Sequence, residues 1–263
     1  MPFVGLGVGV GRQRFGVGGG GFDADYQAVL NYATTQGYTL PSAGQQTLQN
    51  QLVVDLKDGG IWSKLDTFGV FATDGDSDFA LIDWKRLSDY TAFNSPTFTS
   101  NGGFTGNGTS AYIDTNFNPS TSGVNYTLDD ASISIWNNTF VLNNFISGVK
   151  DSVYNCIRMS ASSTNVRINM GLNNLSPVVN FSDATKKFRQ LNRTSSSSVT
   201  SFQDNTSSSH TGSSVNIENQ NQVILRADNF YTSTEVAFFG MGASLVSENT
   251  AFYNAINTYI TSI

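Results

Sequence analysis

The sequence contains few of the side chains that most often carry out chemistry. Its 263 residues include a single cysteine, Cys156, and a single histidine, His210. A lone cysteine excludes an intrachain disulfide and a cysteine-based metal cluster. A catalytic triad would depend on His210, which lies in a run rich in serine and threonine. We interpret this histidine as an incidental loop residue.

Glutamate is also scarce: Glu218, Glu235 and Glu248 are far apart in the sequence. Glycoside hydrolysis normally needs two carboxylates on opposite sides of the scissile bond. Sandwich-type glycosidases place them on one strand in a Glu-x-Asp-x-x-Glu pattern, which cannot be written here. We therefore expect no enzymatic activity. A glycan-degrading enzyme would require carboxylates that are distant in the sequence to converge in a cleft.

Charged residues make up 13% of the chain, whereas ordinary domains contain about 25%. The formal net charge is -6, and the only adjacent basic pairs are Lys85-Arg86 and Lys186-Lys187. Because nucleic-acid binding needs a basic face, we predict no nucleic-acid partner. No apolar run approaches the roughly 20 residues of a membrane span, so we predict no membrane partner. The abundant serine, threonine, asparagine and glycine are typical of β-rich extracellular or virion proteins and of carbohydrate-facing surfaces.

Glycine is concentrated at the start of the chain. Within residues 1–21 glycines alternate with Val4, Leu6, Val8 and Val10. Alternation with period two indicates a strand with one apolar face and one face without side chains. Such a strand cannot stabilise itself, because glycine contributes no packing. One interpretation is an anchoring strand donated to a partner chain, and the other is a flexible spacer.

Capping signals predict three helices. The first follows Asp23 as its cap and ends at Gly37. The second begins at Ser42, which has the spacing of a capping box with Gln45. The third closes the chain after Ser247 as its cap.

From about residue 79 onward the pattern changes to many short strands separated by turn residues. In the stretch NVRINMGL, apolar residues alternate with Arg167 and Asn169, which we expect to face solvent. The chain as a whole predicts a mainly β fold, an antiparallel sandwich of the jelly-roll type with short helical segments. The expected parts are a glycine-rich anchoring arm, a helical lead-in, and a sandwich with a closing helix, at residues 1–21, 22–95 and 96–263.

An acidic cluster is a candidate metal site. Asp74, Asp76 and Asp78 resemble the start of a calcium loop. Phe79 stands where the loop requires glycine, and Lys85 stands where it requires a bidentate glutamate, so an EF-hand is excluded. Another calcium site is one interpretation, and a solvated polar turn is the other. We expect no other cofactor.

An aromatic side chain beside amides is a candidate glycan site. Sugars present apolar faces and many hydroxyl groups, and Trp136 with Asn137 and Asn138 offers a ring and polar partners for them. The alternative is that Trp136 belongs to the core of the sandwich, as single tryptophans in strands usually do.

Three stretches carry a resemblance to a known family. They are Gly60-Ile61-Trp62 with Lys64, the segment GFTGNGTSAYIDTNFNP at 103–119, and the closing residues 235–263. In these stretches the chain resembles bacteriophage and prophage structural proteins in which a short helical segment leads into a concanavalin A-like (laminin-G-like) sandwich. The shared motifs are structural, so the resemblance transfers no functional residue.

The resemblance implies a virion structural protein on the particle surface, such as a tail fibre, head fibre, spike or capsid decoration. By analogy with phage fibres we expect a homotrimer that attaches to other virion proteins through the arm. Contact with host surface polysaccharide is also expected of some such proteins. The alternatives are a carbohydrate-binding module without a structural role and a glycan-degrading enzyme.

Overall fold

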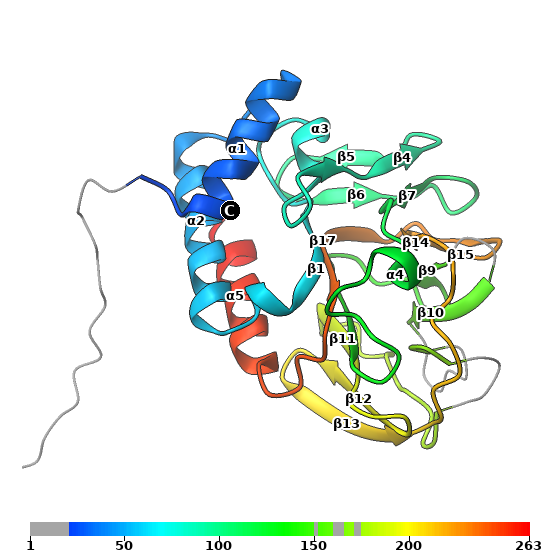
Figure 1. Ribbon diagram of the computed structural model, residues 1–263. Helices are drawn as coiled ribbons and strands as arrows, with labels where there is room; N and C mark the ends of the chain where they lie inside the picture. Colours follow the sequence, from blue (N-terminus) through cyan, green and yellow to red (C-terminus); the bar gives the residue numbers. More distant parts are fainter. Residues whose placement is uncertain (1–20, 150–151, 160–165, 171–174) are drawn as a thin grey trace, which may run out of the picture.

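The chain folds into three layers, namely helices, a ten-stranded sheet and a five-stranded sheet (Figure 1). The computed structural model describes residues 21–149, 152–159, 166–170 and 175–263. The predicted mainly β fold with antiparallel sheets and a closing helix is confirmed. The predicted anchor residues lie outside the described residues: Val4, Leu6, Val8 and Val10.

The helices in the described part are α1 (Ala24–Gln36), α2 (Ala43–Asp58), α3 (Ser77–Ala80), α4 (Pro119–Ser122), α5 (Asn249–Ser262) and the 3-10 turn η1 (Trp62–Lys64). None of the helices described is both long enough and apolar enough to cross a membrane.

The main path of the ten-stranded sheet runs in the order β13 (Thr206–Thr211), β12 (Ser198–Gln203), β11 (Phe188–Arg193), β8 (Ala131–Asn137), β17 (Glu235–Gly242), β1 (Leu65–Val70), β2 (Ile82–Asp83) and β3 (Ser88–Asp89). Off this path, β17 also pairs with β6 (Gly103–Thr105), which pairs in turn with β5 (Thr97–Thr99). The five-stranded sheet has the order β10 (Ser152–Arg158), β9 (Phe145–Val149), β14 (Gln222–Ile224), β7 (Tyr112–Asp114) and β4 (Thr91–Phe93). A small hairpin joins β15 (Arg226–Ala227) to β16 (Phe230–Tyr231).

Two apolar cores hold the three layers together. Successive strand residues point to opposite faces, and Phe238 and Phe239 of β17 illustrate the result. The ring of Phe238 packs toward the helices and lies 5.6 Å from that of Phe252 in α5. Phe239 points the other way, into the core between the sheets, where it joins Ile135 and Ile224. The central strands β11, β8, β17 and β1 of the ten-stranded sheet are therefore buried on both faces, whereas β13 at its edge is largely exposed.

The caps explain where the helices begin and end. The Asp23 side chain accepts a hydrogen bond from Asp25 N at the start of α1, and Gly37 ends this helix with φ of 83°. The Ser42 side chain accepts from Gln45 N, as predicted. The predicted Ser247 cap is wrong, because Glu248 occupies the N-cap position of α5 and makes no side-chain cap bond.

The predicted boundary at residue 95 does not correspond to a break in the structure. β1 pairs with β17 over the register Thr67–Met241 to Val70–Phe238, and β4 pairs with β7. The lead-in thus contributes strands to both sheets. The sequence did not predict β1 as a strand, because the pattern of short strands separated by turn residues begins only at about residue 79.

The stretch around Arg167 also differs from the prediction. It forms a single bridge with Cys156 rather than a strand, and Arg167 and Asn169 are both buried. The Asn169 amide donates to the carbonyl oxygens of Thr127 and Leu128, and its oxygen accepts from the Tyr126 hydroxyl. Because hydrogen bonds satisfy the buried amide, the alternation does not mark a solvent face here.

Asp66 connects the helical side of the chain to the loop before β8. A bulge in β1 lies next to Asp66, whose carboxylate accepts hydrogen bonds from the backbone N–H groups of Val124, Asn125 and Tyr126 at 2.8–3.1 Å. The side-chain amide of Asn125 also donates to it at 2.9 Å. Asp66 is 9% exposed and Tyr126 is 2% exposed, so the Tyr126 N–H has little access to replacement water, whereas Val124 lies at the surface.

We predict that Asp66→Ala lowers the free energy of unfolding by about 2–3 kcal/mol, because it leaves several partly buried N–H groups unpaired. The change is measured as a shift of the midpoint in urea denaturation. Asp58→Ala, at an exposed position on α2, is the matched control and should change stability by less than about 0.5 kcal/mol. Equal midpoints for the two variants would contradict the role given to Asp66.

Candidate functional site

The outer face of the five-stranded sheet carries a row of aromatic and arginine side chains. We call this row the aromatic–arginine face; its members are Phe93, Tyr112, Phe145, Arg158, Arg226, Phe230 and Tyr231. They come from β4, β7, β9, β10, β15 and β16, which are distant in the sequence. The β15–β16 hairpin fits closely against β9 at Gly148, where an added Cβ would lie 2.3 Å from that of Ala227.

At one end of this face two rings are stacked. Phe93 and Tyr112 are direct cross-strand partners in the β4–β7 pair. Their ring centroids are 4.8 Å apart and their planes differ by 8°. Ile113 points into the core between the sheets, so its neighbour Tyr112 points outward. Phe93 is 39% exposed and Tyr112 is only 5% exposed, so the pair presents the Phe93 ring to solvent with Tyr112 packed beneath it.

Arg226 occupies the centre of the face. Its guanidinium lies 4.8 Å from the ring centroid of Tyr112 and 5.1 Å from that of Tyr231. Nε donates to the backbone oxygen of Asp228 at 2.6 Å, and the two Nη atoms have no hydrogen-bond partner among the described residues. Arg226 forms no ion pair within the described part of the chain. Arg226 is only 6% exposed, so two rings and one carbonyl hold a largely buried guanidinium that has no carboxylate partner among the described residues.

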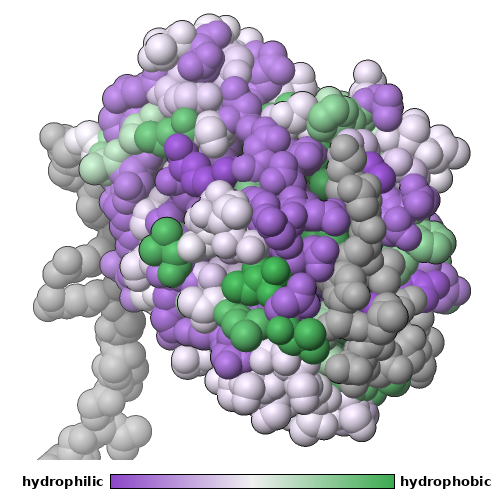
Figure 2. All heavy atoms as spheres, turned by 45° about the vertical axis from the view of Figure 1, so that its right-hand side comes forward, coloured by the Kyte–Doolittle hydropathy of each residue, from purple (hydrophilic) through white to green (hydrophobic). Residues whose placement is uncertain are grey.

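The far end of the face combines an exposed ring with a second cation. Phe230 is 56% exposed and lies 5.5 Å from the ring of Phe145. The guanidinium of Arg158 lies 5.4 Å from the Phe145 centroid, and its Nε donates to the backbone oxygen of Asn143 at 3.0 Å. The side of the molecule that carries the five-stranded sheet is mostly hydrophilic, with small separate groups of hydrophobic atoms (Figure 2).

The arrangement suits a ligand that has both apolar faces and negative charge. An aromatic ring offers a flat apolar surface, and a guanidinium matches a carboxylate through two parallel N–H groups. Because the rings and cations lie on regular strands and a short hairpin, their positions are set before any ligand arrives. Phe93 and Phe230 are exposed, whereas Tyr112, Phe145 and Arg226 are only 3–6% exposed. A ligand would therefore meet two separate exposed rings with a largely buried guanidinium between them.

The predicted glycan platform at Trp136 is wrong. Trp136 is 4% exposed and its ring stacks on Tyr253 of α5 at 6.2 Å, so the alternative assignment to the core is correct. Its indole N–H donates to Asn138 Oδ1, and Asn137 is fully buried. β8 is an inner strand of the ten-stranded sheet and is covered by the helices, so none of these groups can stack on a sugar.

The predicted calcium site is not formed by the acidic cluster. Asp74 accepts from Ser42 N, and Asp76 accepts from Thr39 N and Phe79 N. Asp76 is thereby the N-cap of α3. Among the residues that the structure describes, no group of three acidic, histidine or cysteine side chains could hold a metal ion. The aspartates attach the loop before α3 to the start of α2 instead.

Asp78 lies in a hollow of about 300 Å³ between the end of α1, α3 and β4. Tyr38 and Asp89 also line it, and the Tyr38 hydroxyl donates to Asp89 Oδ2 at 2.8 Å. Burial raises the pKa of Tyr38 well above its usual range, and the hydrogen bond to Asp89 and the negative charges of Asp89 and Asp78 add to this effect. Two carboxylates that are separated in the sequence thus meet in one hollow.

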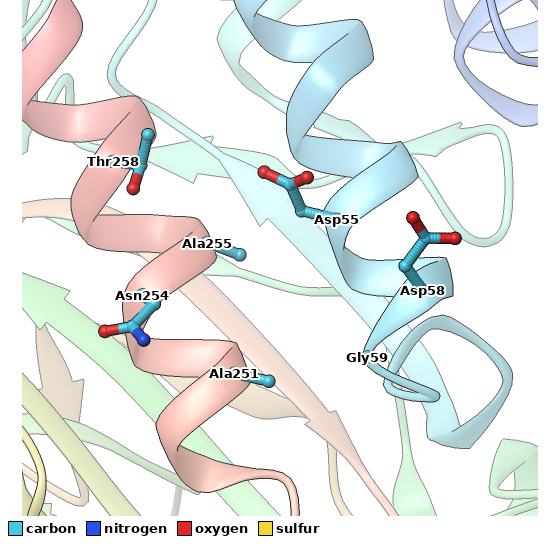
Figure 3. A pocket seen from close by; sticks show the side chains of 7 residues that line it. All are labelled: Asp55, Asp58, Gly59, Ala251, Asn254, Ala255 and Thr258. Atoms are coloured by element: carbon cyan, nitrogen blue, oxygen red, sulfur yellow. The ribbon is translucent and has the colours of Figure 1, made fainter. Parts of the chain in front are cut away.

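A second hollow, of about 240 Å³, lies between α2 and α5 (Figure 3). Its residues are Asp55, Asp58, Gly59, Ala251, Asn254, Ala255 and Thr258. Small residues form the floor, while carboxylates on α2 face the polar side chains of α5 (Figure 3). None of its polar side chains is buried, and we assign no ligand to this groove.

His210 is not the loop residue that the sequence predicts. It lies in β13 and is 3% exposed. Nδ1 lies 2.6 Å from the Pro177 carbonyl oxygen, which can only accept, so Nδ1 carries the proton and Nε2 accepts from Ser201 Oγ at 2.8 Å. The order hydroxyl–imidazole–acceptor matches that of a nucleophile and its base. Both side chains are buried, however, and we interpret the network as hydrogen bonds that hold β12, β13 and the Pro177 segment together.

Sequence reasoning missed every member of the aromatic–arginine face. Phe93 and Tyr112 meet only through the register of β4 and β7, and Arg226 looked like an ordinary strand residue. The one usable signal was aromatic side chains in short strands bounded by turn residues, which many surfaces share.

No protein-family model and no curated protein matches the chain. Among solved structures it is similar to the HCR/D W1238A mutant, with 9% identity and a TM-score of 0.44 over 76% of this chain and 53% of the other. A Trypanosoma rangeli sialidase, in complex with 2,3-difluoro-KDN, has 12% sequence identity and a TM-score of 0.40 over 82% of this chain and 40% of the other. The third structure is domain 4 of AbnA, a GH43 extracellular arabinanase from Geobacillus stearothermophilus in complex with arabinotriose. It has 11% sequence identity and a TM-score of 0.37, over 72% of this chain and 98% of the other. The chain spans about half the length of the first of these, and likenesses at this level carry no information on function.

Asp76 gives a pH-dependent prediction. Burial alone would raise its pKa, but hydrogen bonds from the N–H groups of Phe79 and Thr39 outweigh burial and lower the pKa below its ordinary value of 3.8. The charged carboxylate therefore stabilises the fold above about pH 4, and this contribution is lost as the pH falls through the lower folded-state pKa.

We predict that Asp76→Ala costs about 1 kcal/mol at pH 7, as expected for a lost helix cap. The cost should shrink below pH 3, where the wild-type carboxyl is protonated. Thermal unfolding of both proteins from pH 7 down to pH 2.5 measures it, and 5 mM calcium chloride should leave both curves unchanged. A calcium-dependent rise in the wild-type midpoint that Asp76→Ala abolishes would restore the metal site.

Proposed function

We propose that the chain is a surface appendage of a bacteriophage particle, a fibre, spike or capsid decoration, whose sandwich binds acidic glycans of the host surface. The observation that carries the glycan part is the aromatic–arginine face, with the stacked Phe93–Tyr112 pair beside an unneutralised Arg226. The particle assignment is supported by the resemblance of residues 60–64, 103–119 and 235–263 to phage structural proteins.

Two features of the face favour a saccharide over an apolar protein partner. The exposed apolar groups, Phe93 and Phe230, are separate rings rather than one continuous patch, and apolar protein interfaces need larger contiguous surfaces. Polar groups lie beside the rings: Asn94 follows Phe93 directly, and Asn229 precedes Phe230. Alternating flat rings and polar groups suit a polymer whose units have C–H faces and hydroxyl rims.

The two arginines favour acidic saccharides. The protein carries a net charge of -6, so an acidic polymer is attracted only where cations are concentrated. Arg226 leaves two Nη atoms without partners, as a carboxylate of a uronic or sialic acid would require. A neutral glycan would leave this charge uncompensated in the complex.

Glycoside hydrolysis is a second candidate that rests on one observation. Asp78 and Asp89 line the same hollow, which satisfies the condition that distant carboxylates converge. Asp89 already accepts hydrogen bonds from Tyr32 and Tyr38, however, so one of its oxygens is committed to structure. Release of reducing ends in the binding mixtures described next separates this candidate from binding alone.

We predict that the full-length protein binds acidic members of a panel of purified bacterial capsular and O-antigen polysaccharides, and binds neutral members weakly. Phe93→Ala should weaken binding to the best acidic polysaccharide by about tenfold, since one aromatic contact contributes on the order of 1 kcal/mol. Arg226→Gln should weaken that binding by about tenfold and leave the weak binding of neutral polysaccharides unchanged. Biolayer interferometry at 50 and 500 mM salt measures both effects.

Val124→Ala is the matched control, because Val124 is an exposed apolar residue, 82% accessible, that lies in the loop after α4. It should bind like the wild type. Equal binding by the Phe93→Ala, Arg226→Gln and control proteins, all with wild-type circular dichroism, would remove the aromatic–arginine face as the glycan site.

The particle assignment predicts that the chain is a stoichiometric component of purified phage particles. Quantitative mass spectrometry of gradient-purified particles should find it at a fixed ratio to the major capsid protein, and immunogold labelling should place it on the outside. Its absence from particles, together with its presence in the host-cell lysate, would contradict the assignment and leave a glycan-binding protein without a structural role.

A further inference from the structure

The outermost strand of the ten-stranded sheet, β13, leaves one edge unpaired. Its register with β12 is regular over six pairs, from Ser198–Thr211 to Gln203–Thr206. On the other side, Thr211 exchanges two backbone hydrogen bonds with Ser176, at 2.7 and 2.8 Å. The N–H and C=O of Thr211 therefore point away from β12.

Alternation along the strand then fixes which groups are free. In an antiparallel ladder the N–H and C=O of every second residue point to the same side. Ser207 and Ser209 thus direct their backbone groups outward, as Thr211 does. Gly212 N bonds to Ser197 O, which agrees with this parity. Among the described residues nothing pairs with the outward groups of Ser207 and Ser209.

The segment that pairs with Thr211 cannot cover these groups. After Ser176 the chain passes under the strand, where the Pro177 carbonyl contacts His210. Val179 and Phe181 are then buried in the core between the sheets. A ladder that starts at Ser176 therefore stops after one residue, and the edge beyond it is open.

This edge lacks the features that usually prevent strand addition. Such features are charged side chains, proline, bulges or very short strands. β13 has the sequence TSSSHT, with no charge, proline or bulge, and is six residues long. The edge strand β4 is only three residues long, and β10 is covered at Cys156 by its bridge to Arg167. β10 and β13 thus each carry one bridge, and on β13 the remaining outward groups, those of Ser207 and Ser209, have no pairing partner among the described residues.

The same chain contains a segment suited to such an edge. Residues 3–10 alternate apolar residues with glycine and carry no charge or proline. An added strand of this kind obtains its stability from main-chain hydrogen bonds, and its bare glycine face allows close approach. Residues 1–20 can extend over at most roughly 70 Å, which is enough to reach a neighbouring molecule.

We infer that residues 3–10 of one copy add as a strand to the β13 edge of a second copy. Each molecule gives one arm and accepts one, which is satisfied by reciprocal exchange in a dimer and by head-to-tail exchange in a closed ring such as a trimer. Helix α1 begins at Ala24, soon after Gly21, and lies on the helical side of the molecule, whereas β13 is the outermost strand of the sheet on the other side (Figure 1), which favours exchange between copies. The inference extends the proposed role in a particle and is independent of glycan binding.

The test compares full-length variants by sedimentation velocity at about 10 µM and by amide hydrogen exchange of the 206–211 segment. Ser209→Pro removes an outward N–H that makes no bond to β12, and edge strands tolerate proline at such positions. Ser209→Ala is its matched control. The double variant Leu6→Pro, Val8→Pro changes the donor without altering β13. Phe93→Ala separates assembly from glycan binding.

The wild type, Ser209→Ala and Phe93→Ala should form one closed oligomer, while both proline proteins sediment as monomers. Exchange of the Ser207 and Ser209 amides should be at least about tenfold faster in the arm variant than in the wild type, because their protection comes from the added strand, whereas the Ser208 and His210 amides bond to β12 and should exchange alike in both proteins. A wild-type monomer with protected Ser207 and Ser209 amides would mean that each arm folds onto its own edge, and would overturn exchange between copies. An arm variant that remains oligomeric would show that β13 edges pair with each other, and would also overturn the inference.

Discussion

The rest of the structure depends on the backbone pairing of β17 with β1 and β8. β17 comes almost at the end of the chain and β1 comes soon after the first helices, so this pairing joins the two ends of the described chain at the centre of the larger sheet. The approach is close: a Cβ at Gly242 would lie 2.0 Å from the Lys64 carbonyl oxygen, so no larger residue fits there. Because β1 follows α2, and α5 follows β17, the same pairing brings both helices to one face of the sheet. The helical layer is therefore a consequence of strand order rather than a separate domain.

This arrangement divides the surfaces of the sandwich by role. The central strands of the ten-stranded sheet are covered on one face by helices and on the other by the five-stranded sheet, so this sheet is accessible at its edge strands. The five-stranded sheet has no helical cover, and its outer face carries the aromatic–arginine face. Buried polar side chains reinforce the division: Asp83, fully buried, accepts hydrogen bonds from Thr67 and Arg86, and Arg86 also donates to the Thr115 carbonyl. Such a network ties β1 and β2 to the loop after β7, and it holds the sheets in a fixed relation.

Local signals in the sequence predicted local structure. Asp23, Ser42 and Gly37 act at the helix ends as expected, because a cap needs only residues within one turn. The mainly β fold was also predictable, since many short strands with turn residues leave few alternatives. The partner of each strand was not, because pairing depends on residues far apart in the sequence. Trp136 illustrates the limit: its sequence neighbourhood suits a sugar platform, but β8 lies beneath α5, where Tyr253 covers the ring. The aromatic–arginine face was missed for the same reason, because Arg226 is a candidate binding residue only through its contact with Tyr112, more than a hundred residues earlier in the sequence.

The glycine-rich start of the chain is best understood together with the open edge. A strand in which every second residue is glycine loses more conformational entropy on ordering than an ordinary strand, and it gains little from packing. It can become ordered only where many main-chain hydrogen bonds form at once, and a free sheet edge supplies them. An open edge, in turn, promotes aggregation unless a dedicated strand occupies it. The arm alone would be unstable and the edge alone would promote aggregation, whereas pairing of the two would satisfy both. Assembly through β13 also leaves the outer face of the five-stranded sheet uncovered, so an oligomer would present several aromatic–arginine faces at once. Several weak sites would then bind a repetitive polysaccharide with high avidity, because sites held in one particle act at a high effective concentration.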